Sequence, residues 1–167
     1  MTKRTYKFRL YPSKQQITIL NETLEICRNV YNEQLKNKIV WYEDEGQSLS
    51  YPDLNSMLLD LRVLNPDIKK VHSQVLQDIN NRITKAFDNF FRRITQGEKA
   101  GFPGFKGKHR YDSITYPQTG YKFVSQKRLK VSKIGELSIK LHRAIKGTMK
   151  TMNIQKTASS RWFACFS

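Results

Sequence analysis

The pattern of apolar positions divides the chain into a strand, a helical stretch and a second stretch of strands. Residues 4–11 alternate apolar and polar positions, which predicts a half-buried strand. From Ser13 to about Gln96 the apolar positions recur every three or four residues, which predicts helices. Beyond Gly97 the period returns to two. The sequence therefore predicts an α+β fold in which helices separate the first strand from the others.

The first strand has two distinct faces. Tyr6, Phe8 and Leu10 share the inner face, while Lys7 and Arg9 point outward. No other strand is predicted beside it in the sequence. We therefore expect it to pair with the C-terminal strands, which makes the helices an insertion.

Three helices are predicted within the helical stretch. The first spans residues 13–46, where Ser13 and Gln16 have the spacing of a capping box. The second spans residues 50–65 and the third about 73–96. The inward positions of the third helix are Leu76, Ile79, Ile83, Phe87, Phe90 and Ile94. Inward stripes and short links predict a small helical bundle.

Two hairpins are predicted after the helices. One covers residues 129–141, and the other covers residues 152–166 with Ser159 and Ser160 at its tip. Short strands at this spacing are typical of a β-barrel or a sandwich.

Charge is distributed unequally along the chain, whose net charge is +16. Residues 1–98 hold fifteen basic and twelve acidic residues, a net +3, whereas residues 99–167 hold fifteen basic and two acidic residues, a net +13. Such a concentration repels itself unless a polyanion neutralises it. Aromatic and β-branched residues are mixed with the basic ones, which indicates a folded nucleic-acid-binding surface rather than a disordered tail.

Other classes of protein fit the sequence less well. No apolar run approaches the roughly 20 residues that span a bilayer, and no secretory signal is present, so a cytoplasmic location is expected. A membrane-surface protein would need an amphipathic basic helix, but the basic half predicts strands. Cys27 and Cys165 are too isolated for a zinc site or a disulfide framework, and we interpret both as small buried residues.

Six blocks of residues, in order along the whole chain, are similar to a known family. They are Tyr6–Ser13, Arg28–Asn32, Ser73–Gln77, Ala86–Arg93, Gly101–Lys106 and Thr115–Gln118. On these blocks the chain resembles the N-terminal half of TnpB, also called OrfB, which bacterial insertion sequences encode. TnpB proteins are transposon-encoded, RNA-guided DNA endonucleases related to type V CRISPR effectors.

The resemblance implies a particular domain organisation. Residues 1–12 and 98–167 would form the wedge domain, an oligonucleotide-binding-like β-barrel that is interrupted after its first strand by a helical recognition domain at residues 13–97. The family's RuvC nuclease and four-cysteine zinc domains have no counterpart in these 167 residues. We therefore expect no catalytic residue, metal ligand or cofactor in this chain, with Mg²⁺ and Zn²⁺ confined to the missing nuclease domains.

Two interpretations of function remain open at this stage. The chain is either the nucleic-acid-binding portion of an RNA-guided nuclease or a truncated, nuclease-dead protein that regulates by binding DNA or RNA alone. The expected partners are a guide RNA from the transposon end, target double-stranded DNA, and a nuclease domain in cis or a longer copy of the protein.

The resemblance also implies contacts to a short duplex motif beside the target. The residues at the matching positions are Tyr51, Ser73, Gln74, Gln77, Tyr116 and Gln118. Glutamine can pair with an adenine edge, and tyrosine can stack or contact a phosphate. Structural alternatives are that Ser73 caps its helix, Gln77 lies on a solvated face and Tyr51 covers a helix start.

Basic residues of the strands, of the loop before them and of the end of the third helix are expected to hold RNA. They are Lys7, Arg9, Arg92, Arg93, Lys106, Lys108, Arg110, Lys127, Arg128, Lys130, Lys140 and Arg143. The glycines of Gly101–Lys106 would let the backbone approach a phosphate closely. Alternatively, Phe102 and Phe105 in this block simply anchor the loop.

Overall fold

The first strand folds as its alternation predicts. The computed structural model describes residues 4–167, so residues 1–3 of the predicted wedge domain lie outside the described part. Strand β1 spans Tyr6–Tyr11. Tyr6, Phe8 and Leu10 are at most 6% exposed, whereas Lys7 and Tyr11 are exposed.

The helices begin and end close to the predicted residues. They are α1 (Lys14–Glu45), α2 (Tyr51–Leu64), a short 3-10 helix η1 (Pro66–Lys70) that was not predicted, and α3 (Ser73–Thr95). Capping boxes at Ser13 and Ser50 start α1 and α2. The prediction that Ser73 could cap its helix is wrong. His72 caps α3 instead, because its Nδ1 accepts a hydrogen bond from the backbone amide of Gln74 (3.2 Å).

A buried polar network joins the three helices. The Gln34 side-chain amide of α1 donates to the Leu54 carbonyl (2.7 Å) and to Asn80 Oδ1 (3.1 Å). Asn80 in turn donates to Asn55 Oδ1 (2.8 Å). Gln34 and Asn80 are fully buried, so these hydrogen bonds satisfy groups that water cannot reach.

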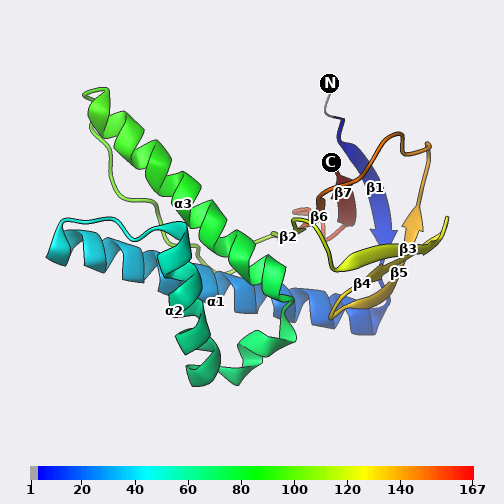
Figure 1. Cartoon of the computed structure of the whole chain (residues 1–167). Coiled ribbons are helices and arrows are strands. Elements are labelled where there is room, and N and C mark those ends of the chain that lie inside the picture. Colours follow the sequence, from blue (N-terminus) through cyan, green and yellow to red (C-terminus); the bar gives the residue numbers. More distant parts are fainter. Residues whose placement is uncertain (1–3) are drawn as a thin grey trace.

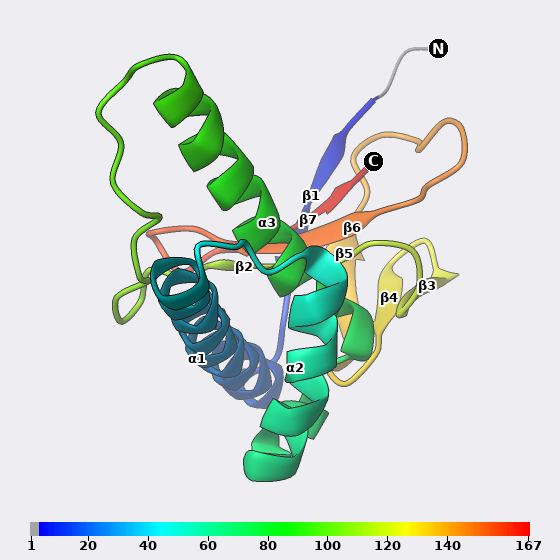
Figure 2. The ribbon, with the colours of Figure 1, turned by 60° about the vertical axis from the view of Figure 1, so that its left-hand side comes forward.

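The inward stripe of α3 ends before the helix does. Phe87 and Phe90 are buried, but Ile94 is 46% exposed, so its predicted inward position is wrong. Figures 1 and 2 show the reason, because the C-terminal end of α3 diverges from α1 and extends beyond the other helices.

The strands form a single antiparallel sheet in the order β2-β6-β7-β1-β5-β4-β3. The further strands are β2 (Ser113–Tyr116), β3 (Tyr121–Ser125), β4 (Arg128–Val131), β5 (Gly135–Lys140), β6 (Met152–Lys156) and β7 (Trp162–Phe166). Strand β1 pairs with both β7 and β5, which confirms the predicted pairing of the first strand. The hairpins β4–β5 and β6–β7 are also confirmed, whereas β2 and β3 were not identified individually.

The sheet curls into a half-barrel, which confirms the α+β class without showing a closed barrel. Its edge strands β2 and β3 are not paired with each other in the described part of the chain. A hydrogen bond connects β2 to the β4–β5 turn instead, because the Tyr116 hydroxyl donates to the Ser132 carbonyl (3.0 Å).

The helices and the sheet share one core. The buried residues of both form a single cluster, and the Gln16 side chain at the start of α1 donates to the Glu136 carbonyl of β5. In Figure 1, α1 runs from beneath the sheet to the far end of the helical part. The first half of α1 therefore belongs to the core of the sheet, and its second half to the core of the helices.

Candidate nucleic-acid interface

The outer face of the sheet carries basic side chains on the four neighbouring strands β1, β5, β4 and β3. We call Lys7, Arg9, Lys122, Arg128, Lys130 and Lys140 the basic face. Arg9 stands directly opposite Lys140, and Lys122 stands opposite Lys130. Like charges in these positions destabilise a sheet, so a bound polyanion would relieve the repulsion.

Aromatic side chains lie among these cations. The Lys7 ammonium is 4.6 Å from the centre of the Phe163 ring, and the Arg9 guanidinium is 5.1 Å from that of Tyr11. Arg9 Nε is buried without a hydrogen-bond partner within residues 4–167. Cation–π contacts thus hold both side chains against the sheet. Phe163 was not identified as a site residue, although its position opposite Arg9 follows from the strand register.

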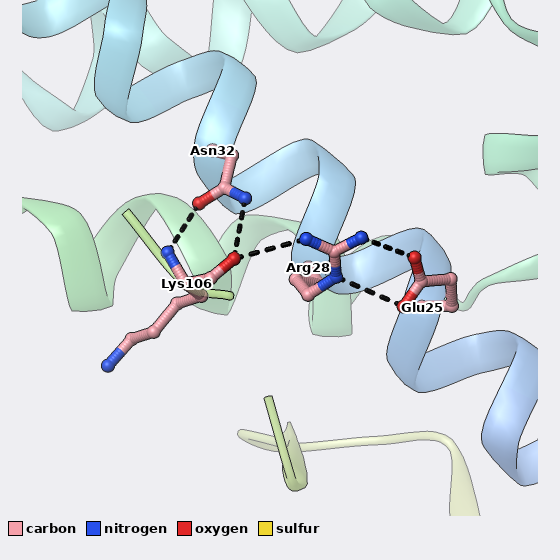
Figure 3. Close-up of polar contacts among 4 residues, drawn as sticks. All are labelled: Glu25, Arg28, Asn32 and Lys106. Carbon is pink, nitrogen blue, oxygen red and sulfur yellow. Dashed lines mark hydrogen bonds and ion pairs between the residues drawn. The ribbon is translucent and has the colours of Figure 1, made fainter. Parts of the chain in front are cut away.

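A loop of residues 96–112, the connector, returns from the end of α3 to the sheet (Figure 2). Asn32 of α1 holds its backbone at Lys106 through two hydrogen bonds: Lys106 N donates to Asn32 Oδ1 (2.8 Å), and Asn32 Nδ2 donates to Lys106 O (2.9 Å). Arg28 also donates to Lys106 O (3.1 Å). Figure 3 shows these contacts, which we call the clasp. The clasp fixes Lys106 while leaving its side chain exposed.

Glu25 completes the clasp by orienting Arg28. Arg28 Nε donates to Glu25 Oε2 (3.0 Å), one turn away on the same helix (Figure 3). This hydrogen bond, with the positive charge behind it, lowers the pKa of the Glu25 carboxyl. Arg28 and Asn32 were not predicted as site residues, although their spacing of four places them on one helix face.

Aromatic packing holds the connector nearer to α3. The Phe102 ring lies 5.0 Å from Phe90 and 5.9 Å from Tyr42 between ring centres, so the anchoring alternative is right for Phe102. Phe105 is 57% exposed and anchors nothing buried. The basic side chains predicted to hold RNA along this stretch are exposed, namely Arg92, Arg93, Lys106, Lys108 and Arg110.

The remaining basic positions lie at the edge of the half-barrel. Lys127 occupies the turn before β4 and is exposed. Arg143 follows β5, where its guanidinium is 4.7 Å from the centre of the Tyr6 ring. Together with Lys140 they line a hollow of about 940 Å³ beside the β5–β6 loop.

The start of α3 meets the β2–β3 loop. Gln74 Oε1 accepts hydrogen bonds from the amides of Gln118 (3.2 Å) and Thr119 (3.0 Å). The structure thus brings together Gln74 and Gln118 from the predicted DNA set, with exposed Ser73 and Gln77 on the first turns of α3. No hydrogen bond or aromatic contact within residues 4–167 joins Tyr51 to this group.

Tyr116 does not fit its predicted role. Its side chain is 1% exposed, and its hydroxyl is bound to Ser132, so it packs in the core and is not available to DNA. The backbone around it depends on this packing. Gly120 has φ +98°, and a Cβ there would lie 2.6 Å from Tyr116 Cδ1, so only glycine fits.

The part of the chain that the structure describes contains no group of three or more histidine, cysteine or acidic residues that could hold a metal ion. Cys27 is buried, and burial raises the pKa of its thiol to about 12. None of the helices in this part has the length and apolarity needed to cross a membrane.

Comparisons with known proteins point to one family. A family model for the OrfB_IS605 helix-turn-helix domain matches residues 1–47. In the described part of that stretch these residues form β1 and the unbroken helix α1, so no turn interrupts the helix.

Two curated proteins are similar over almost the whole chain. One is named "Putative RNA-guided DNA endonuclease InsQ", from Escherichia coli strain K12, and is 25% identical over 162 residues. The other is named "Putative RNA-guided DNA endonuclease", from Streptomyces pristinaespiralis, and is 26% identical over 168 residues. Each match covers 96% of this chain but only 39% and 40% of the relatives, so the chain spans about two fifths of their length. Together these similarities support assignment of the chain to the TnpB/OrfB family.

Proposed function

We propose that this chain is the nucleic-acid-binding portion of an RNA-guided DNA endonuclease and acts in the cytoplasm. In this proposal the half-barrel is an oligonucleotide-binding-like wedge domain and the helices are a recognition domain. The wedge holds guide RNA, and the helices contact a short motif in target double-stranded DNA. Cleavage, with its Mg²⁺ and the structural Zn²⁺, is assigned to nuclease domains outside these residues.

The basic face is the observation that carries the RNA-binding part. Its cations stand opposite one another, and only Glu136 adds a negative charge to the outer side of these strands. A phosphate backbone supplies a matching row of negative charges and releases its counterions on binding. The exposed connector cations, of which Lys106 is held by the clasp, extend this surface toward the helices.

The junction of α3 with the β2–β3 loop supports the DNA-binding part. Ser73, Gln77 and Gln118 are exposed there and offer donors and acceptors of the kind that read base edges. The side-chain carbonyl oxygen of Gln74 already accepts two hydrogen bonds from the loop, so we assign Gln74 the role of positioning Gln118.

The RNA-binding part is tested by removing charge from the basic face. The variant Lys7→Gln, Lys122→Gln, Lys130→Gln, Lys140→Gln removes four exposed cations without touching the core. The slope of log affinity against log salt for single-stranded RNA should fall by about 3, because each lost phosphate contact removes about 0.7. A matched variant with Lys14, Lys36, Lys69 and Lys85 changed to Gln removes the same charge from the helices and should keep most of the slope. Equal losses of slope in both variants would mean that RNA binding depends on total charge and not on the basic face.

Two further measurements test specificity. RNA that co-purifies with the expressed protein should be dominated by a transposon-end sequence, whereas random host RNA would contradict guide binding. Gln77→Ala should weaken binding to the preferred duplex motif more than to random duplex, by about 1–3 kcal/mol for a lost base contact. An equal loss on both duplexes would refute base reading at Gln77.

A further inference from the structure

A small hollow of about 320 Å³ lies where α1, α3 and the connector meet. We call it the tyrosine hollow. The residues that matter for its chemistry are Tyr31, Arg82, Lys106, Arg110, Tyr111 and Asp112. The clasp bears directly on it, because Asn32 and Arg28 hold the backbone of Lys106 at its edge.

The charges around the hollow leave one positive charge in excess. Arg82 is neutralised by Asp78, with 2.9 Å between Nε and Oδ2, and its terminal nitrogens donate to Ser113 and Thr115. Lys106, Arg110 and Asp112 form no ion pair within 4 Å in the described part of the chain. Two available cations therefore face one carboxylate.

Two tyrosine hydroxyls are also available. The rings of Tyr31 and Tyr111 lie 5.9 Å apart and are almost fully buried, at 5% and 7% exposure. Neither hydroxyl forms a hydrogen bond with the described residues. In these residues, the fully buried side-chain polar atoms that lack a hydrogen bond are Arg9 Nε and Asn153 Oδ1, so neither hydroxyl oxygen is fully buried. Both hydroxyls therefore reach solvent although their rings do not.

Their protonation suits a donor role. Burial raises the pKa of Tyr31 and that of Tyr111, and the nearby Arg82 offsets this only partly. Both hydroxyls thus keep their protons at neutral pH and can donate to an anion.

We propose that the tyrosine hollow binds one phosphodiester group of a nucleic-acid backbone. Tyr31 and Tyr111 donate hydrogen bonds to its oxygens, and Lys106 and Arg110 balance its charge. The single excess positive charge matches a diester, which carries one negative charge, better than inorganic phosphate, which carries closer to two near neutral pH. This inference rests on the proposed function and adds a specific contact to it.

Isosteric variants test the hydroxyls. Tyr31→Phe and Tyr111→Phe keep the rings and remove only the donors, and each should weaken binding of a short single-stranded RNA about tenfold, as expected for hydrogen bonds to a charged group. Tyr42→Phe is the matched control, because Tyr42 also packs against aromatic rings near the connector but does not line the hollow. It should bind as the wild type does. Arg110→Gln, an exposed change that leaves the fold intact, should lower the salt slope by about 0.7.

A second measurement separates this inference from the proposed function. The full chain is titrated with dimethyl phosphate and, separately, with inorganic phosphate, while amide shifts of residues 106–113 are followed by NMR. Dimethyl phosphate should shift them at lower concentration than inorganic phosphate, and Tyr31→Phe should abolish the response.

The possible results have different consequences. Normal RNA binding by both tyrosine variants would refute phosphodiester binding in the tyrosine hollow and leave the proposed RNA-binding function intact. A response to dimethyl phosphate in a chain that binds no RNA would support the hollow and refute the proposed function. A stronger response to inorganic phosphate would overturn the assignment to a diester.

Discussion

Among residues 4–167, charged side chains form ion pairs in one part of the molecule and none in the other. These parts are the helical segment, residues 13–97, and the sheet segment, residues 4–12 and 98–167. The helical segment contains eleven basic and eleven acidic residues, so the whole net charge of +16 belongs to the rest of the chain. All four ion pairs of the described residues lie within the helical segment. The helical segment thus satisfies its own charges, whereas the sheet segment keeps its cations available to a partner.

Polar residues that are buried as a whole follow the same division. Thr23, Gln34, Lys38 and Asn80 are buried, and all four belong to the helical segment. The interior of the half-barrel is lined by apolar and aromatic side chains. We infer that specific hydrogen bonds fix the arrangement of the helices, while the sheet relies on apolar burial and uses its polar groups on the outside.

The largest expected effect tests whether the two segments are separable. Phe8→Ala in β1 and Phe87→Ala in α3 each remove a fully buried ring and should lower the free energy of unfolding by about 3–5 kcal/mol. In a Trp41→Phe background, fluorescence of buried Trp162 reports the sheet and far-UV ellipticity reports mainly the helices. The two urea curves should coincide in both variants, because one core joins the segments. A shift of only one signal would divide the chain into independent domains.

The next effect concerns the buried network of the helices. Asn80→Ala removes one of the two acceptors of the Gln34 amide and the donor to the Asn55 carbonyl, which should cost about 1–3 kcal/mol in urea unfolding. Asn81→Ala is the control, because that side chain forms no hydrogen bond within residues 4–167 and the change should cost under about 0.5 kcal/mol. Similar losses of stability in the two variants would mean that the buried polar network does not distinguish the helical segment from the sheet segment.

A smaller effect is expected at the clasp, where the segments meet. Asn32→Ala removes both side-chain bonds to Lys106 and should cost about 1 kcal/mol. Hydrogen exchange at the Lys106 amide should accelerate about fivefold or more, while exchange in the core strands stays unchanged. Asn29→Ala, an exposed change on the same helix, should leave Lys106 protected. Unchanged protection in Asn32→Ala would mean that packing alone holds the connector.

The smallest effect is a pH dependence at the other junction. Burial lowers the pKa of His72, and the Lys133 charge contributes in the same direction, so the folded state favours the neutral ring that caps α3. This contribution is complete above the ordinary value of 6.5 and declines as the pH falls below it toward the folded pKa. His72→Asn keeps a capping side chain but cannot titrate, and between about pH 7.5 and 5.5 it should lose less stability than the wild type by under about 1 kcal/mol. Parallel stability curves for the two proteins would contradict the cap.

Local rules were enough to predict most of the elements. The capping box at Ser13 and the alternation around Phe8 each depend on a few neighbouring residues, and both are confirmed. Strands β2 and β3 were harder to identify, because four- and five-residue strands give a weak period-two signal. The exposure of Ile94 and the burial of Tyr116 depend on where neighbouring elements end, which no local pattern records.

The sequence by itself determined the class of the fold, the order of its elements and the concentration of charge outside the helices. These properties follow from hydrophobic period, capping chemistry and composition, which are local or additive. Only the tertiary structure decided that Asn32 holds Lys106, that Gln74 holds the β2–β3 loop and that two tyrosine hydroxyls share a hollow with Arg110. Those contacts join residues far apart in sequence, and their geometry exists only once the shared core has set the distance between α1, α3 and the sheet.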